Sequence, residues 1–323
     1  MPHSFRYLRA LAAVVVAGAL AGCLPQNQTL RIATHPWVGY ESLCLAEDLG
    51  ELPPSVTLQH GAHAADTLAA LKAGTVDAGM LTLDEMLAAR AAGTPLAAVL
   101  IFDSSSGADV LLVRHGIQHL GDLAGKRIGY EASAVGALIF GEVLARAGLT
   151  RQAVTPVELP VQDHLSAWRD GRVDAIVSFE PTASQLVADG AERLFDTRQM
   201  PDTIFDVLAM RTDRLAGRKA ALRQAIQKHF EMRAYINQNR DDAAYRIAAH
   251  QGVTAADVRH ALAGVTVPDL GGNRYALHSG SRFEVAAQGV HRLMIERGML
   301  PPQNSLAGLF QADFLPPPQD TAP

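Results

Sequence analysis

The sequence predicts an α/β protein with two lobes, each a mainly parallel sheet flanked by helices. The chain has 323 residues, which is too long for one ordinary core. Similar segments recur about 100 residues apart, which is close to the size of one lobe. Apolar strand-like runs alternate with helical patterns, as in parallel sheets.

The internal repeat is clearest in two segments of 15 residues. LAALKAGTVDAGMLT runs from Leu68 to Thr82, and LSAWRDGRVDAIVSF runs from Leu165 to Phe179. Each has a helical apolar pattern, then Gly, then Val-Asp-Ala and a short apolar strand. A weaker match pairs LRIAT, beginning at Leu30, with KRIGY, beginning at Lys126. Each lobe is therefore predicted to contain one strand–helix…helix–strand unit.

The N-terminal segment is predicted to be a signal peptide over residues 1–22. Arg6 and Arg9 precede the apolar run Leu11–Gly22, which is too short to span a bilayer. Leu20-Ala21-Gly22-Cys23 resembles the bacterial lipobox, which implies lipidation of Cys23 and a membrane anchor. A plain signal peptide with an incidental cysteine is the alternative. Residues 23–29 would form a tether.

Two segments are predicted to cross between the lobes. The first contains the Ser/Gly stretch Asp103–Asp109, and the second is the apolar segment near Thr203–Arg211. Residues 30–103 and 205–315 are assigned to lobe 1, residues 104–204 to lobe 2, and residues 316–323 to a disordered tail. Helices packing on lobe 1 are expected at Ala220–Asn237, Asp241–Gln251, Thr254–Ala263 and Phe283–Arg297.

Composition excludes several kinds of partner. The net charge of −5 and the lack of a basic run argue against binding to nucleic acid.

Cys44 is the one cysteine besides Cys23, so no internal disulfide is expected, and Cys44 is predicted to be buried in a helix. No cofactor motif is present, and no metal site is expected. The C-terminal histidines lack metal-ligand spacing and are assigned to the surface: His250, His260, His278 and His291. A monomer is expected.

Ligands of open α/β sheets bind beyond the carboxyl ends of the strands, near helix N-termini. Five segments should meet in one cleft if the two lobes face each other. They are Thr34–Glu41, Leu81–Glu85, Asp103–Asp109, Tyr130–Gly136 and Ser178–Pro181.

The motifs PWVGYE, GTVDAGMLT and GRVDAIVSFEP resemble the nitrate/sulfonate/taurine class of ABC-transporter solute-binding proteins. The wider superfamily includes thiamine-precursor binders. This resemblance implies a type II periplasmic-binding-protein fold that closes on a small molecule, with ABC permease and ATPase subunits as partners. It also implies a location in the periplasm or at the cell surface. The candidate ligand-binding residues are Trp37, Tyr40, Thr82, Ser106, Asp109, Glu131, Ser133 and Glu180.

Each candidate also has a structural interpretation. The aromatic side chains could only pack the loop, and the hydroxyl and acidic residues could cap helices or turns. Asp77 and Asp174 are expected to be structural, because both copies of the repeat contain them. Replacing Trp37 or Glu180 with Ala should weaken ligand binding with little loss of stability.

The charge of the five segments bears on the ligand. They contain no Lys or Arg, and their acidic residues are Glu41, Asp84, Glu85, Asp103, Asp109, Glu131 and Glu180. This favours an amine or nitrogen heterocycle. A nitrate-like or sulfonate anion held by helix N-termini stays open. A ligand-sensing lipoprotein is a further alternative. A pyrimidine-precursor enzyme on the same fold is disfavoured, because those enzymes use a cysteine-rich motif and a reactive lysine. The protein is therefore not expected to be an enzyme.

Overall fold

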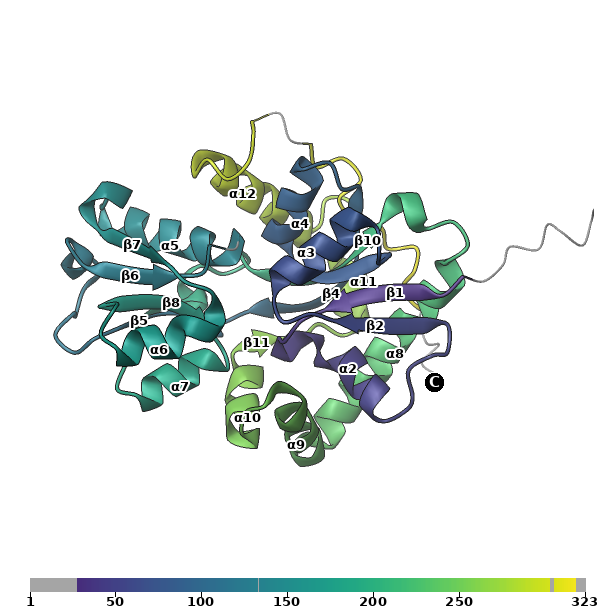
Figure 1. Cartoon of the computed structure of the whole chain (residues 1–323). Coiled ribbons are helices and arrows are strands. Elements are labelled where there is room, and N and C mark those ends of the chain that lie inside the picture. The colour runs from purple at the N-terminus through teal and green to yellow at the C-terminus, as the bar shows by residue number, and fades with distance from the viewer. Residues whose placement is uncertain (1–27, 133, 303–304, 318–323) are drawn as a thin grey trace, which may run out of the picture.

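The computed structural model describes residues 28–132, 134–302 and 305–317. The predicted signal peptide, the lipidation site Cys23, Ser133 and positions 318–323 of the predicted tail lie outside these ranges. Two lobes stand side by side, each built on its own sheet (Figure 1). Both sheets are covered by helices, which confirms the predicted fold class.

The sheet of lobe 1 has six strands in the order β11-β4-β10-β3-β1-β2. These strands are β1 (Leu30–Thr34), β2 (Val56–His60), β3 (Ala78–Thr82), β4 (Leu96–Ser105), β10 (Phe205–Arg211) and β11 (Val265–Thr266).

The sheet of lobe 2 has five strands in the order β7-β6-β8-β5-β9. These strands are β5 (Asp109–Val113), β6 (Arg127–Tyr130), β7 (Thr155–Glu158), β8 (Ala175–Phe179) and β9 (Glu192–Asp196). Strand β5 pairs antiparallel with β8 and β9, and β10 pairs antiparallel with β3 and β4. These are the two strands by which the chain enters one lobe from the other, so they run against the strands of the repeat. Short β11 also pairs antiparallel, with β4.

The predicted repeat is present in the strand register. Ile32 of β1 faces Ala78 of β3, and Ile128 of β6 faces Ala175 of β8. The aspartate of Val-Asp-Ala has the same structural role in both copies. Asp77 accepts the backbone N–H of Arg31 at 3.0 Å, and Asp174 accepts that of Arg127 at 2.9 Å. Each carboxylate thus ties the start of one strand to its neighbour.

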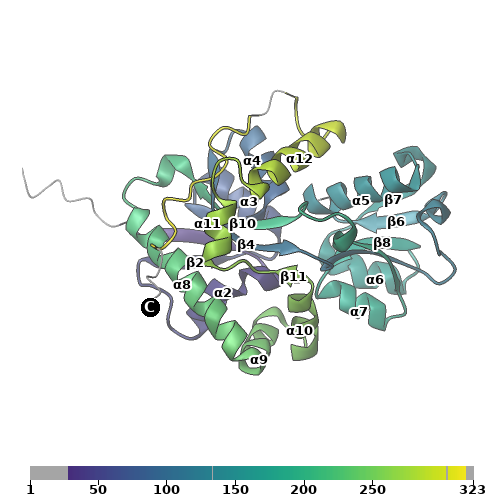
Figure 2. The same ribbon diagram turned by 180° about the vertical axis from the view of Figure 1, so that it is seen from behind.

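Helices cover both faces of each sheet. In lobe 1 they include α2 (Glu41–Asp48), α3 (Ala64–Ala73) and α4 (Leu83–Ala91), and in lobe 2 they are α5 (Ala134–Ala147), α6 (His164–Arg169) and α7 (Thr182–Ala188). The C-terminal helices are α8 (Lys219–Gln238), α9 (Arg240–Gln251), α10 (Ala255–Ala263), α11 (Leu270–Ala276) and α12 (Arg282–Glu296). They pack around lobe 1 (Figure 2).

The four predicted C-terminal helices are confirmed, and α11 was not predicted. Its sequence LGGNRYA contains two glycines, which are poor helix formers. Tertiary contacts hold it instead: the buried side chain of Asn273 binds both the N–H and the C=O of Ile101 in β4, at 2.8 and 3.1 Å. Cys44 is buried in α2 as predicted. Among the described helices, none is both long and apolar enough to cross a membrane.

The chain crosses between the lobes twice. Strand β4 ends at Ser105 and β5 begins at Asp109, so the first crossing is only three residues long. Lobe 1 therefore extends two residues past the predicted boundary at 103, because Ser104 and Ser105 still pair with neighbouring strands. The return crossing lies between the end of β9 at Asp196 and the start of β10 at Phe205.

Candidate functional site

A cavity of about 360 Å³ lies between the two lobes. Lobe 1 and the return crossing line it with His35, Pro36, Trp37, Tyr40, Ala62, His63, Ala64, Thr82, Glu85, Ile204, Asp206, Gln251, Gly252 and Val253. Lobe 2 lines it with Asp109, Glu131, Val135, Val161, Gln162, Leu165, Phe179, Pro181, Thr182 and Gln185. Most of these residues lie at or after the ends of β1, β2 and β3 in one lobe and of β6, β7 and β8 in the other, whereas Asp109 begins β5, Asp206 lies in β10, and Gln251 ends α9. Equivalent ends of the repeat thus confront each other across the cavity.

Two aromatic rings from opposite lobes meet at the cavity. Trp37 and Phe179 pack edge to face with ring centroids 5.9 Å apart. The indole N–H of Trp37 donates to Asp103 Oδ2 at 3.2 Å, which fixes the ring plane. Gly39 permits this approach, because a Cβ there would lie 1.6 Å from Asp103 Oδ2. The pair gives the cavity an aromatic wall suited to a planar or cationic ligand.

Among the residues that the structure describes, four acidic side chains line the cavity and no Lys or Arg does so. They are Glu85, Asp109, Glu131 and Asp206. Asp109 Oδ2 and Asp206 Oδ2 are buried and have no hydrogen-bond partner among the described residues. Buried carboxylates without partners are costly, so a positively charged or hydrogen-bond-donating ligand would stabilise them.

Asp206 and Asp103 face each other directly across β10 and β4. Both are fully buried, and the hydroxyl of Tyr40 donates to Asp206. Burial raises the pKa of Asp103 to about 7. Burial and the charge of Asp103 raise the pKa of Asp206 well above its usual range. Like charges this close disfavour each other's ionisation, so the pair holds a proton near neutral pH.

Burial also perturbs the other carboxyl groups of the cavity floor. It raises the pKa of Asp109 to about 7. It raises the pKa of Glu85 to about 8, with a further contribution from the neighbouring charge of Asp84. His35 does not offset these acids, because burial and then the proximity of His63 lower its pKa to about 4. His35 is therefore neutral at pH 7.

Three helix N-termini at the cavity already hold carboxylates of the protein. Asp66 accepts the N–H groups of Ala62 and His63 at the start of α3. Glu85 accepts the N–H of Thr82 at the start of α4, at 3.0 Å. Glu180 accepts an N–H of the first turn of α7, at 3.0 Å. The negative charge of each carboxylate partly offsets the positive end of its helix, which makes these N-termini less favourable for an anionic ligand.

Five of the eight candidate residues line the cavity: Trp37, Tyr40, Thr82, Asp109 and Glu131. Their contact with ligand remains a prediction. The side chain of Thr82 also caps α4 by accepting the N–H of Glu85 at 3.4 Å. Tyr40 is 1% exposed and has its hydroxyl on Asp206. Both residues therefore have a structural role in addition to the predicted ligand contact.

Ser106 and Glu180 do not line the cavity, which corrects their predicted placement. Ser106 lies in the first crossing, and its N–H donates to the C=O of Gly264. Glu180 turns toward α7, and its Oε1 lies 3.6 Å from Arg193 and 3.5 Å from His260 of α10. Glu180 therefore joins the two lobes instead of facing a ligand.

Several lining residues were not among the candidates. Asp206 lies in β10, outside the repeat, although an aspartate inside the apolar run TIFDVLAMR signals a buried acid. Glu85 and Phe179 belong to segments that were predicted to reach the cleft, but neither was singled out. Gln162 lies in a 3-10 turn four residues after the end of β7, and Gln251 is the last residue of α9, so neither belonged to a segment that was predicted to reach the cleft.

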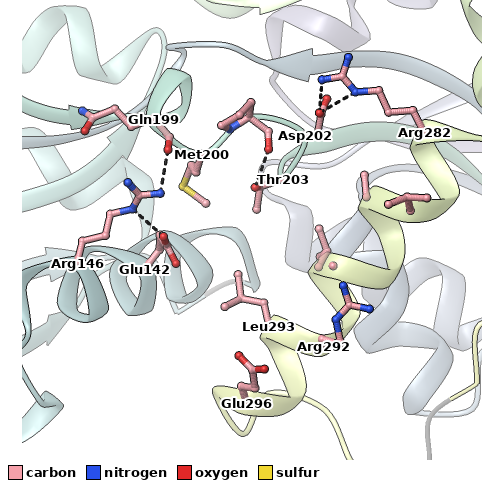
Figure 3. Close-up of a pocket in the computed structure, with 15 residues that line it drawn as sticks. Glu142, Arg146, Gln199, Met200, Asp202, Thr203, Arg282, Arg292, Leu293 and Glu296 are labelled. Atoms are coloured by element: carbon pink, nitrogen blue, oxygen red, sulfur yellow. Dashed lines mark hydrogen bonds and ion pairs between the residues drawn. The ribbon is translucent and has the colours of Figure 1, made fainter.

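A second depression of about 630 Å³ lies outside the cleft, between α5 of lobe 2 and α12 of lobe 1 (Figure 3). Arg146 donates to Glu142 at 2.7 Å and to the C=O of Gln199 at 2.9 Å, and Arg282 donates to Asp202 at 2.9 Å (Figure 3). These two arginines are already paired, so the acidic cleft is the better candidate site.

Comparison with known proteins gives a family match and a curated relative. The family described as NMT1/THI5 like matches residues 55–231. An aliphatic sulfonates-binding protein of Escherichia coli is 27% identical over 192 residues, which is 58% of this chain. The chain spans only 60% of the length of that relative.

Two solved structures show the same fold. The alkanesulfonate-binding protein SsuA from Xanthomonas axonopodis pv. citri, bound to MOPS, has a TM-score of 0.75 at 23% identity, covering 89% of this chain and 99% of that one. The periplasmic aliphatic sulphonate binding protein SsuA from Escherichia coli has a TM-score of 0.73 at 19% identity, covering 88% and 92% of the two chains. These relatives are named for sulfonates, so they give no support to an amine ligand and fit the anion alternative.

Proposed function

The chain belongs to the NMT1/THI5-like family, and from that premise we propose that it is the solute-binding component of an ABC importer. The observation that carries this proposal is that residues of both lobes, including matching strand ends of the repeat, line one cavity. A ligand held there contacts both lobes at once, so its binding energy favours the closed arrangement. The closed protein would then be recognised by the permease. In this proposal the protein works as a monomer outside the cytoplasmic membrane, anchored through lipidated Cys23.

We further propose that the ligand is an amine or a nitrogen-rich ring. Four acidic side chains line the cavity, no Lys or Arg does so, and His35 is neutral at pH 7. Trp37 and Phe179 supply faces for cation–π or stacking contacts. Anions such as sulfonates are usually bound by Arg, Lys or free helix N-termini. Here three of the nearby N-termini are occupied by Asp66, Glu85 and Glu180.

A sulfonate is the second candidate, because the relatives named above bind sulfonates by name. Main-chain N–H groups elsewhere in the cavity would have to hold it. A catalytic role is not proposed, since none of the lining residues in the described part of the chain is Lys, Cys or Ser.

The experiment is a thermal-shift and calorimetric screen of the full chain carrying Cys23→Ser. The two panels are amines and aminopyrimidines (putrescine, choline, 4-aminopyrimidine) and sulfonates without an amino group (methanesulfonate, ethanesulfonate, benzenesulfonate). A ligand at 100 times its Kd stabilises the protein by about 2.7 kcal/mol. We expect stabilisation by members of the first panel only. Stabilisation by sulfonates alone would refute the amine assignment while preserving the receptor. The absence of any response in both panels would count against the cavity as a solute site.

A further inference from the structure

Cys44, His60 and His250 form a cluster at the edge of lobe 1. One ligand atom of each lies within 4.8 Å of the other two. They come from three elements far apart in the sequence: α2, the end of β2 and the end of α9. The two imidazole rings pack edge to face at 5.5 Å. A thiol and two imidazoles converging in this way match the donor set that proteins use for zinc.

Two glutamates hold the histidines in place. Glu47 Oε2 lies 2.7 Å from His60 Nε2, and Glu41 Oε2 lies 3.0 Å from His250 Nδ1. Ligating histidines in metal sites commonly share their second ring nitrogen with a carboxylate, which fixes the tautomer and the ring orientation. Each histidine has a carboxylate on one ring nitrogen, which leaves the other nitrogen for an ion, and either glutamate could alternatively provide an oxygen ligand.

The cluster combines a buried sulfur with accessible nitrogens. Cys44 is 6% exposed, whereas the side chains of His60 and His250 are 41% and 40% exposed. An ion can therefore reach the histidines from solvent and meet the thiol on the inner side. Zinc bonds of about 2.3 Å to sulfur and 2.0–2.1 Å to nitrogen put ligand atoms roughly 3.5 Å apart. The ligand atoms lie within 4.8 Å of one another, so the two exposed histidine side chains would have to move toward the sulfur by up to about 1 Å.

We propose that Cys44, His60 and His250 bind a divalent ion of the zinc type, with a glutamate or water as fourth ligand. Other histidines of the described chain pair with acids without a thiol nearby, as His115 does with Glu192 at 2.8 Å. The cysteine distinguishes the cluster from such surface pairs, and thiolate ligands favour zinc-type ions over magnesium or calcium.

The proposed metal site adjoins, in the sequence, residues that line the cavity. His250 directly precedes Gln251, Gly252 and Val253, which line the cavity. Gln251 also donates to Glu41 at 2.7 Å. A bound ion would therefore tie the end of α9 to α2 and fix one wall of the cavity, without itself lying among the cavity-lining residues.

The test is a cobalt titration of the full chain carrying Cys23→Ser, which leaves Cys44 as the one thiol. After treatment with chelator and its removal, Co²⁺ is added and absorption is recorded. We expect one equivalent to produce a thiolate-to-cobalt charge-transfer band, and Zn²⁺ to abolish it by competition. Cys44→Ser should remove the band, and His60→Gln and His250→Gln should each weaken binding 10- to 100-fold. The matched control His115→Gln should bind as the parent does.

His60→Gln keeps the test decisive if Cys44→Ser disturbs folding, because His60 is exposed at the end of β2. The absence of the band in the parent would overturn the proposal. Equal affinity in His60→Gln and the parent would do the same. No cleft ligand is needed in this experiment, so its result is independent of the proposed transport function.

Discussion

Replacing Asp109 by Asn is expected to stabilise the ligand-free protein while weakening the binding of a cationic ligand. Asp109 begins β5, lines the cavity and is 3% exposed. Its Oδ2 has no hydrogen-bond partner among the described residues. Burial raises its pKa from 3.8 to about 7. The carboxylate is therefore kept at a cost in stability, as expected for a binding residue.

The size of the effect follows from that pKa. A pKa higher in the folded than in the unfolded state means that ionisation favours unfolding. The wild type thus loses stability relative to Asp109→Asn as pH rises from about 4 to about 7. A rise from 3.8 to about 7 corresponds to roughly 4 kcal/mol above pH 7. Water entering the cavity reduces this penalty, so we expect about 1–3 kcal/mol.

The assay is urea denaturation of both proteins at pH 4 and pH 8, with Asp170→Asn as an exposed control. Asp109→Asn should be more stable at pH 8 and equal to the parent at pH 4, and the control should change by less than about 0.5 kcal/mol. Calorimetry should show cation affinity reduced about 10- to 100-fold, as for the loss of a hydrogen bond to a charged group. Lower stability of Asp109→Asn at pH 8 would refute the reasoning.

Three further predictions concern neighbouring positions. Gly39→Ala should lower the free energy of unfolding by about 1–3 kcal/mol, because its Cβ would lie 1.6 Å from Asp103 Oδ2; an unchanged urea midpoint would contradict this. Asp174→Asn should cost about 1 kcal/mol at pH 7. Hydrogen bonds from Arg127 lower the pKa of Asp174. The difference in the free energy of unfolding between Asp174→Asn and the wild type should therefore disappear as pH falls below about 4. A difference that does not depend on pH would argue against the ion pair. Trp37→Ala should weaken binding of an aromatic amine about tenfold by calorimetry, whereas equal affinity would show that the ring lies away from the ligand.

The sequence predicted the strands and loops that belong to the internal repeat. Matched strands, glycine positions and Val-Asp-Ala motifs recur in the two lobes, and Asp77 and Asp174 make the same hydrogen bond in each. Because strand ends follow from the repeat, four of the eight candidate residues could be placed at the cavity, and Asp109 was placed there from the predicted crossing between the lobes. Local patterning was sufficient for these elements.

Features outside the repeat could not be predicted in this way. Asp206 reaches the cavity on the strand that returns from lobe 2, and its pairing with Asp103 depends on sheet order. Glu180 lies at a strand end as expected, but hydrogen bonding to α7 turns it away. His60 and His250 are 190 positions apart, so no spacing rule brings them to Cys44. Helix α11 depends on Asn273 binding β4. In each case a long-range contact overrides the local signal.

If the ligand is the amine proposed above, the Asp103–Asp206 pair would make its binding an exchange reaction. Near neutrality the pair carries a shared proton, and an incoming ammonium group competes for the same oxygens. Uptake should therefore release acid into the buffer, which calorimetry in buffers of different ionisation enthalpy would detect. The affinity for this ligand should fall as pH falls, so the protein would bind it more tightly at alkaline than at acidic pH.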